Sequence, residues 1–338
     1  MHLQRNVLVR AIGVVGLIAV GFSPALAHAE HIKIGILKTP PSGLVFIALD
    51  RGYFAAEGLD VELSYFEAGQ PIALATAAAS IDFGANGPSA AFYNLAGEGV
   101  LRIISGMYRE APSFRILGYV ASTHAVAAGL TSLKDLPHHS LAVSQVGSPP
   151  HYALALLAEK YHFELDSIKL LAMQSVPNMI SALSGGQADA TIITGAAAVA
   201  IDQRKEGKLL GWVGDETPWQ MGVLWTSTKI IRERQDMIGR FLRAYRRGAR
   251  DYHDAFTGSN EERADGPTTT EIVAIIAKYT GLAAMQIEQT VAYTDPALRI
   301  DVNDIRHQIL WFRSQGMIKG DFHPDTVIDK HYAVALSD

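Results

Sequence analysis

The feature that most constrains this chain is a repeated alternation of short apolar runs with helix-length segments rich in small residues. The strand-like runs of a first unit lie at 31–37, 59–63, 83–85 and 101–104. Helical segments lie between them, at 44–53 and 72–79. Strands that alternate with helices are joined by crossover connections. We therefore expect an α/β fold with a largely parallel sheet covered by helices on both faces.

A second unit repeats this pattern. Its strand-like runs lie at 141–143, 168–171 and 190–193, and its helical segments at 151–162 and 177–183. The stretches 72–91 and 180–199 share one order of features: an alanine-rich helix, a turn with Asp82 or Asp189, a strand and a small polar loop. This order predicts two related lobes, although generic α/β architecture would produce a similar pattern.

The last third of the chain is predicted to be mainly helical, from 235 onward and at 271–279, 283–293 and 302–315. Four arginines crowd one face of its first helix: Arg240, Arg243, Arg246 and Arg247. The net charge of the chain is -5. We therefore interpret these arginines as a solvated face, and we expect no nucleic-acid partner.

The N-terminal residues 1–29 are predicted to be a signal peptide. Arg5 and Arg10 precede an apolar run at 11–22, which is too short for a typical bilayer span. The small residues that follow this run permit cleavage after Ala27 or Ala29. The chain contains no cysteine, so it cannot be a lipoprotein. We expect a periplasmic protein that is not embedded in a membrane.

The residues that commonly carry catalysis form no recognisable pattern. The absence of cysteine excludes disulfides, zinc–thiolate sites and cysteine nucleophiles. The chain has no Gly-x-Ser-x-Gly, Walker or His-Glu-x-x-His motif, and its histidines, among them His138, His139, His323 and His331, lack ligand spacing. We therefore expect a protein without catalytic activity, cofactor or metal.

Five polar, glycine-containing loops follow predicted strands, at 39–43, 69–71, 86–89, 145–148 and 193–195. Ligands of open parallel sheets bind beyond the carboxyl ends of the strands, where loops lead into helix N-termini. Glycines such as Gly43 and Gly87 let backbone amides approach a ligand. Helix capping is the alternative role for the serines and asparagines, but five such loops together predict a shared cleft.

Several stretches resemble one protein family. The residues 66–71, 80–84 and 86–88, with further matches at 48–61 and 147–152, resemble the periplasmic binding proteins of the nitrate/sulfonate/taurine ABC-importer family. That family also includes binding proteins for thiamine-pyrimidine precursors. The resemblance implies a two-lobed type II periplasmic binding protein fold, each lobe a mainly parallel sheet flanked by helices.

The resemblance also implies domain boundaries and ligand contacts. The first lobe would comprise 30–118 plus 222–338, the second 119–221, and the hinge would lie near 118–120 and 220–222. Residues that would face the cleft by position are Ser42, Gln70, Asn86, Ser89, Ser148, His151 and Thr194. Where some sulfonate binders carry Trp-Asp-Pro after the last strand of the second lobe, this chain has Thr194-Gly195-Ala196, which suggests a differently shaped ligand.

Charged and aromatic ligand partners are less defined. Arg109 or Arg115 would suit an anion by forked hydrogen bonds, although surface ion pairing is the alternative. Phe46 and Trp219 would suit a planar ligand by stacking, or else fill the core.

The implied function is that of a monomeric, soluble component of an ABC importer. It would bind a small organic anion or planar heterocycle, of the sulfonate, carboxylate or pyrimidine class, and deliver it to a membrane permease with its ATPase. Two alternatives stay open: a periplasmic ligand sensor for a membrane receptor, and an enzyme of the thiamine-pyrimidine or menaquinone type on the same fold.

Overall fold

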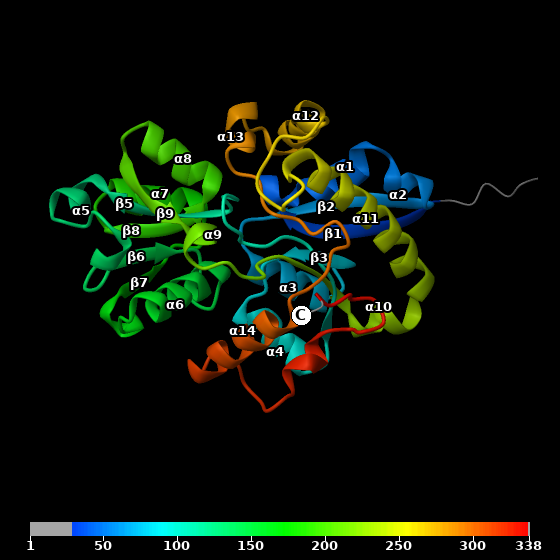
Figure 1. Ribbon diagram of the computed structural model, residues 1–338. Helices are drawn as coiled ribbons and strands as arrows, with labels where there is room; N and C mark the ends of the chain where they lie inside the picture. Colours follow the sequence, from blue (N-terminus) through cyan, green and yellow to red (C-terminus); the bar gives the residue numbers. More distant parts are fainter. Residues whose placement is uncertain (1–28, 337–338) are drawn as a thin grey trace, which may run out of the picture.

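The structure, a computed structural model, describes residues 29–336. The expected signal peptide lies outside the described residues, apart from its last position. Within the described chain, no helix combines the length and the apolarity needed to cross a membrane. Two five-stranded sheets, each covered by helices, lie side by side (Figure 1).

The first sheet has the strand order β2-β1-β3-β10-β4. β1 pairs in parallel with β2 and β3, whereas β10 is antiparallel to both β3 and β4. The strands are β1 (Glu30–Leu37), β2 (Leu59–Phe66), β3 (Phe83–Asn86), β4 (Leu101–Gly106) and β10 (Val223–Ser227).

The second sheet repeats this topology in the order β7-β6-β8-β5-β9. β6 pairs in parallel with β7 and β8, and β5 is antiparallel to β8 and β9. The strands are β5 (Leu117–Ser122), β6 (Ser140–Val143), β7 (Lys169–Ala172), β8 (Ala190–Thr194) and β9 (Gly207–Trp212).

Both sheets are therefore mixed: in each, four strands run in one direction and one strand, β10 or β5, runs against them, which fits the expected mainly parallel sheets. The reversed strands, β5 and β10, are the first strands after the chain crosses from one sheet to the other, so each enters its new sheet from the opposite end. No strand was predicted at β5, β9 or β10. β5 and β10 are short and fully buried, and β9 lacks a regular alternation of buried and exposed residues, so none of them carries a clear periodic signal.

Two aspartates in equivalent positions support a structural repeat. Asp82 precedes β3, and its Oδ2 accepts a hydrogen bond from the backbone N–H of Lys33 in β1 at 2.7 Å. Asp189 precedes β8, and its Oδ2 accepts the backbone N–H of Ser140 in β6 at 2.8 Å. Each carboxylate thus joins the start of one strand to its parallel neighbour.

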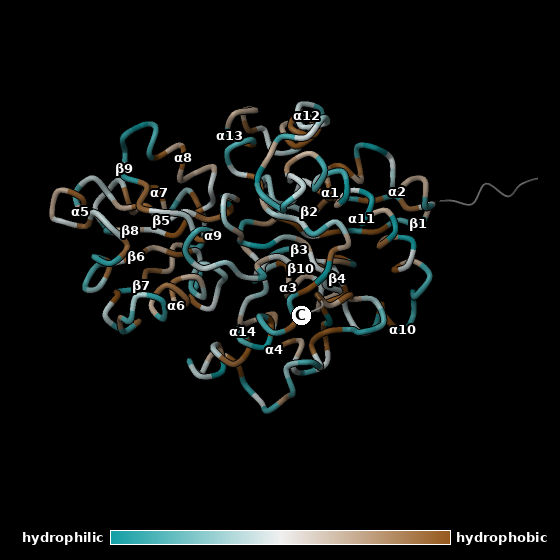
Figure 2. Tube along the Cα trace, in the orientation of Figure 1, coloured by the Kyte–Doolittle hydropathy of each residue, from teal (hydrophilic) through white to brown (hydrophobic). Residues whose placement is uncertain are grey.

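Helices cover both faces of each sheet and enclose an apolar core. Around the first sheet, α1 and α11 lie on one face, and α3 and α4 lie on the other (Figure 1). The helices are α1 (Gly43–Asp50), α2 (Tyr53–Ala56), α3 (Gly69–Ala77), α4 (Ala90–Gly97), α5 (Thr123–Ala127), α6 (Pro149–Tyr161), α7 (Val176–Ser184), α8 (Gly195–Gln203), α9 (Val213–Glu216), α10 (Thr228–Glu233), α11 (Gln235–Phe256), α12 (Thr269–Thr280), α13 (Ala284–Glu288) and α14 (Val302–Ser314), with short 3-10 turns at Pro40–Ser42, Leu133–Asp135, Leu165–Ser167 and Pro324–Val327. Figure 2 shows hydrophilic stretches, in teal, in outer segments such as those before β9 and after α10.

The helix expected at 283–293 is shorter than predicted. Only α13 is helical, and the following segment pairs with the chain that crosses between the sheets. The backbone N–H of Arg115 donates to the carbonyl of Val291 at 3.1 Å, and that of Arg109 donates to the carbonyl of Tyr293 at 2.9 Å. Long-range backbone pairing therefore ends the helix.

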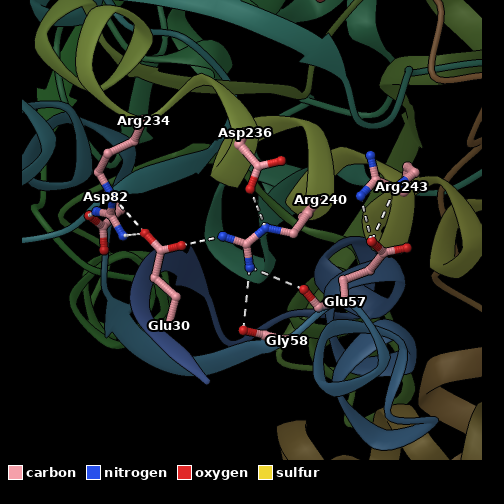
Figure 3. A network of polar contacts seen from close by, with 8 residues as sticks. All are labelled: Glu30, Glu57, Gly58, Asp82, Arg234, Asp236, Arg240 and Arg243. Atoms are coloured by element: carbon pink, nitrogen blue, oxygen red, sulfur yellow. Dashed lines mark hydrogen bonds and ion pairs between the residues drawn. The ribbon is translucent and has the colours of Figure 1, made fainter. Parts of the chain in front are cut away.

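The arginine face of α11 is not merely solvated, as the sequence suggested, but takes part in an ion-pair network. Arg240 pairs with Asp236 and Glu30, and Arg234, just before α11, pairs with Glu30 and Asp82 (Figure 3). Arg243 pairs with Glu57 at 2.7 Å. Burial opposes ionisation of Glu30, but hydrogen bonds from the two arginines outweigh it and lower its pKa. The network attaches α11 to the beginning of β1 and to the end of α2.

Candidate functional site

A cavity of about 480 Å³ lies between the two sheets. Its walls come from the loops at the carboxyl ends of β1, β2 and β3 and from those at the carboxyl ends of β6 and β8. All five polar loops identified in the sequence contribute lining residues. The volume falls within the range of about 300–1,000 Å³ that is typical of small-molecule sites.

Ser148 is the most informative polar residue of this cavity. It is 3% exposed, and its hydroxyl has no hydrogen-bond partner within the described chain. Ser148 lies at the N-cap of α6, yet its side chain does not cap the helix, whose first two residues, Pro149 and Pro150, have no N–H. A buried hydroxyl without a partner costs about 1–3 kcal/mol. A ligand atom in the cavity can satisfy it.

Asn86 lines the same cavity from the first sheet. It is 5% exposed, and its Oδ1 accepts a hydrogen bond from the Tyr108 hydroxyl at 2.9 Å. This bond orients the side chain and leaves the amide Nδ2 as a donor. A Cβ at Gly69 would lie 2.7 Å from that Nδ2, so the glycine is what allows Asn86 to lie against the start of α3. Burial raises the pKa of Tyr108, which keeps its hydroxyl a donor.

Two of the helix N-termini around the cavity, those of α4 and α8, are occupied by protein groups, whereas α3 begins at the cavity without a side-chain cap. The backbone N–H of Ala90, the first residue of α4, donates to the carbonyl of Gly147 at 2.9 Å. The backbone N–H of Gly195, the first residue of α8, donates to the carbonyl of Ile116 at 2.7 Å. Because α6 begins with two prolines, three helices offer fewer backbone donors than the sequence suggested. The polar part of the cavity therefore consists mainly of neutral side chains.

The charged residues that line the cavity, Lys38, Glu67 and Arg204, are all exposed. Lys38 Nζ lies 5.9 Å from the centre of the Tyr65 ring, and Tyr65 is itself 45% exposed. The described lining therefore places no buried charged side chain in the cavity. Charge at this site acts through solvent and is screened by salt.

Five of the residues predicted from the sequence line the cavity: Gln70, Asn86, Ser89, Ser148 and Thr194. Ser89 has a second role as the N-cap of α4, since its Oγ accepts the backbone N–H of Phe92 at 3.3 Å. Thr194 occupies the N-cap of α8 without making a side-chain cap bond, so its hydroxyl is not committed to the helix.

Three predicted residues near the start of α1 are packed away from the cavity lining. The Ser42 hydroxyl donates to the carbonyl of Leu37 at 2.8 Å. A Cβ at Gly43 would lie 2.7 Å from the Tyr252 ring, so this glycine serves the packing of α1 against α11. Phe46 is fully buried and stacks on Tyr279 with ring centres 4.9 Å apart. These residues are corrected from ligand contacts to packing groups.

Gly87 and His151 support the cavity without lining it. A Cβ at Gly87 would lie 2.5 Å from Cγ of Pro149, so the glycine permits close approach of loops from the two sheets. His151 lies behind the loop that carries Ser148, where its Nδ1 accepts the backbone N–H of Gly147 at 3.1 Å. Burial lowers the pKa of His151 to about 4, so the ring is a neutral acceptor. The predicted contacts of both residues with ligand are corrected to positioning roles.

Arg109, Arg115 and Trp219 are also absent from the cavity lining. Arg109 pairs with Asp301 at 3.6 Å in a separate pocket of about 770 Å³ beside the C-terminal segment. The Arg115 guanidinium lies 5.3 Å from the centre of the Trp212 ring. Trp219 is 2% exposed and packs edge-on against Tyr152. Ion pairing and core filling, the alternatives noted for the sequence, describe Arg109 and Trp219.

Sequence reasoning missed the apolar lining of the cavity. Val176, Met179 and Ile180 of α7 contribute, as do small residues of α8, and their helical spacing looked like an ordinary core face. Leu282, Gln286 and Thr290 come from the segment around α13, far along the chain, and no local signal pointed to them. Tyr108, which orients Asn86, lies two residues after β4 and was detectable only as a polar aromatic residue near a strand end.

The NMT1/THI5-like family model matches residues 40–255. No curated protein sequence matches the chain significantly. Among solved structures, the alkanesulfonate-binding protein SsuA from Xanthomonas axonopodis pv. citri, bound to MOPS, is 19% identical with a TM-score of 0.69, over 86% of this chain and 95% of that chain.

Two further solved structures show how widely this fold is used. The periplasmic nitrate-binding protein NrtA from Synechocystis PCC 6803 is 12% identical with a TM-score of 0.65, over 89% of this chain and 86% of that chain. A DSZB mutant in complex with biphenyl-2-sulfinic acid is 13% identical with a TM-score of 0.59, over 90% of this chain and 97% of that chain. At these identities the likeness concerns the fold, a two-lobed α/β type II periplasmic binding protein fold, as the sequence predicted. Because the family model covers more than half of the chain, the protein belongs to the NMT1/THI5-like family.

Proposed function

We propose that the protein captures a small organic anion or planar heterocycle, of the sulfonate, carboxylate or pyrimidine class, in the cavity between its two sheets. The observation that carries this proposal is the buried, unpartnered hydroxyl of Ser148 in a cavity lined from both sheets. Asn86 supplies a second oriented polar group from the opposite side. Such convergent polar groups in an otherwise apolar cavity are typical of small-molecule sites.

Binding would close two lobes, 30–118 plus 222–338 and 119–221, on the ligand. The two segments that cross between the sheets pair with each other: the backbone N–H of Glu110 donates to the carbonyl of Trp219 at 3.0 Å, and that of Gly222 to the carbonyl of Tyr108 at 2.7 Å. A short paired ribbon of this kind suits a hinge. The hinge expected at 118–120 and 220–222 remains a prediction.

We further propose that the protein is a periplasmic, monomeric component of an ABC importer that delivers its ligand to a permease with an ATPase. The structurally similar nitrate-binding protein is periplasmic. Another similar structure is the ligand-binding component of an ABC-type import system from Staphylococcus aureus. The predicted signal peptide supports export. Binding without turnover is favoured because the described lining holds one carboxylate, the exposed Glu67, and no histidine.

Thermal unfolding of the mature protein against alkyl and aryl sulfonates, nitrate, aromatic carboxylates, pyrimidines and amino acids tests this proposal. A ligand at about one hundred times its dissociation constant should add roughly 2.7 kcal/mol to the free energy of unfolding and raise the midpoint. Mass spectrometry should recover the ligand unchanged, which distinguishes binding from catalysis.

The double variant Ser148→Ala/Asn86→Ala should weaken binding of any hit at least tenfold. The matched control is Ser259→Ala/Asn260→Ala, which makes the same chemical changes at two exposed residues of a surface turn. Unchanged affinity in the Ser148/Asn86 variant would remove this cavity as the binding site.

A further inference from the structure

We infer that the ligand has a single polar head on an apolar body about the size of one or two rings, and that it is an organic anion rather than a small, wholly polar ion. This inference rests on the proposed function and narrows its substrate class. It follows from how polar, apolar and charged groups are distributed around the cavity.

The polar groups of the cavity suit one compact head. Ser148 offers an uncommitted hydroxyl, and Asn86 offers an amide held in place by Tyr108. The first backbone donors of α4 and α8 are already bonded to protein carbonyls. The side chains of Gln70, Gln145 and Gln286 add further neutral hydrogen-bonding groups to the lining, as does the start of α3. A bare oxyanion such as nitrate would use such groups but would leave the apolar wall of the cavity uncovered.

One wall of the cavity is an uncovered part of the apolar core beneath the second sheet. Met179 of α7 and Ile193 of β8 belong to that core, and Val176, Ile180 and Ala197 are partly buried against it. All five residues also line the cavity. Val176, Ile180 and Ala197 are only partly buried. A wholly polar ligand would leave these three side chains in contact with water, whereas an apolar body would remove them from water at about 25 cal/mol per Å².

The opposite side of the cavity offers flat and aromatic surfaces. Pro41 lines it from the loop after β1, and Tyr65 and Phe66 line it from the end of β2. A cavity of about 150 Å³ is enough to hold benzene in an apolar protein interior. The volume of about 480 Å³ therefore has room for a ring or two together with a polar head.

The charged lining favours an anion over a cation. Two of the three charged lining residues are basic, Lys38 and Arg204, and all three are exposed. Exposed cations attract an anion from solution but do not bury its charge. Recognition is therefore expected to depend more on the apolar body than on the charge.

Matched anions test the inference. We expect benzenesulfonate to bind at least tenfold more tightly than methanesulfonate, taurine or nitrate in isothermal titration of the mature protein. The first pair differs only in the apolar body, and taurine adds a second polar group.

Two variants test whether the apolar body of the ligand lies against this wall of the cavity. Ile180→Asn places an amide on the apolar wall, and Ala200→Gln adds a polar side chain on the adjoining face of α8 without creating a void. Each should weaken benzenesulfonate binding at least fivefold and leave methanesulfonate binding within twofold. Leu74→Asn, at a 51% exposed residue outside the cavity lining, is the control and should change neither affinity.

The possible results separate the two proposals. If methanesulfonate, taurine or nitrate binds as tightly as benzenesulfonate, or if only a pyrimidine or amino acid from the wider panel binds, the apolar-body inference is overturned and the proposed capture function stands. If wild-type protein, freed of co-purified ligand by unfolding and refolding, binds no member of either set, both are overturned.

Discussion

The backbone N–H of Ala90 in α4 donates a hydrogen bond to the backbone carbonyl of Gly147, 2.9 Å away, and so joins the two halves of the protein beside the cavity. Gly147 has a φ of +76°, and a Cβ there would lie 2.9 Å from Cβ of Ala90. The contact therefore needs a glycine for both backbone conformation and space. It holds the loop that carries Asn86 against the loop that carries Ser148.

The first prediction concerns this contact. Gly147→Ala should lower the free energy of unfolding by about 2–3 kcal/mol, through left-handed backbone strain and the clash with Ala90. Gly186→Ala is the control, because Gly186 has a φ of +71° but open space around its Cβ position. The control should cost about 1 kcal/mol and leave ligand affinity unchanged. Equal costs in urea denaturation would show that the contact between the loops contributes nothing.

The second prediction concerns His151, whose pKa burial lowers to about 4 from an ordinary 6.5. As pH falls below 6.5, the unfolded chain gains a proton that the native protein does not accept until about pH 4. This residue should therefore cost about 3 kcal/mol of stability as pH falls through that window. His151→Gln should remove this contribution, so that in urea titrations between pH 4 and 7 the free energy of unfolding rises less with pH than it does in wild type. A variant with the same slope as wild type would contradict the assignment.

The third prediction concerns Asp304, which accepts hydrogen bonds from the backbone N–H of Gln220 and from the Gln308 side chain. Burial raises the pKa of Asp304 to about 6 from 3.8, despite these bonds. The native protein thus holds this proton more tightly than the unfolded chain, so stability present below pH 3.8 is lost as pH rises to about 6.

Asp304→Asn should remove that loss, which amounts to about 3 kcal/mol. The contribution of Asp304 to stability falls as pH rises, whereas that of His151 rises with pH over an overlapping range. Relative to wild type, the Asp304 variant should therefore gain stability as pH rises from 4 to 6, and the His151 variant should lose it. Parallel profiles in all three proteins would disprove both assignments.

The fourth prediction concerns Glu30, which pairs with Arg234 and Arg240 in the network of Figure 3. Glu30→Gln should lower the free energy of unfolding by about 1 kcal/mol, and the loss should shrink at high salt because these side chains are partly exposed. Glu233→Gln removes an exposed pair with Lys229 at 3.9 Å and is the control. The control should stay within about 0.5 kcal/mol of wild type.

Local sequence determined the positions of most strands and of the polar loops. Apolar runs such as 31–37 and 190–193 are long enough to identify without tertiary information. The loops that follow them converge because the carboxyl ends of parallel strands share one edge of a sheet. Gln70, Asn86, Ser89, Ser148 and Thr194 accordingly line the cavity, and their contact with a ligand stays a prediction. Asp82 and Asp189 were paired by pattern, and each makes the equivalent bond to a neighbouring strand.

Only the tertiary structure decided which way each side chain faces and what packs against it. Phe46, His151 and Trp219 were candidates for ligand contact, but neighbours distant in sequence bury them elsewhere. The same holds for the reversed strands β5 and β10, whose direction depends on the path of the crossing chain, and for the apolar cavity wall of α7. Periodicity reports that a residue prefers burial, whereas the partner that buries it is set by long-range packing.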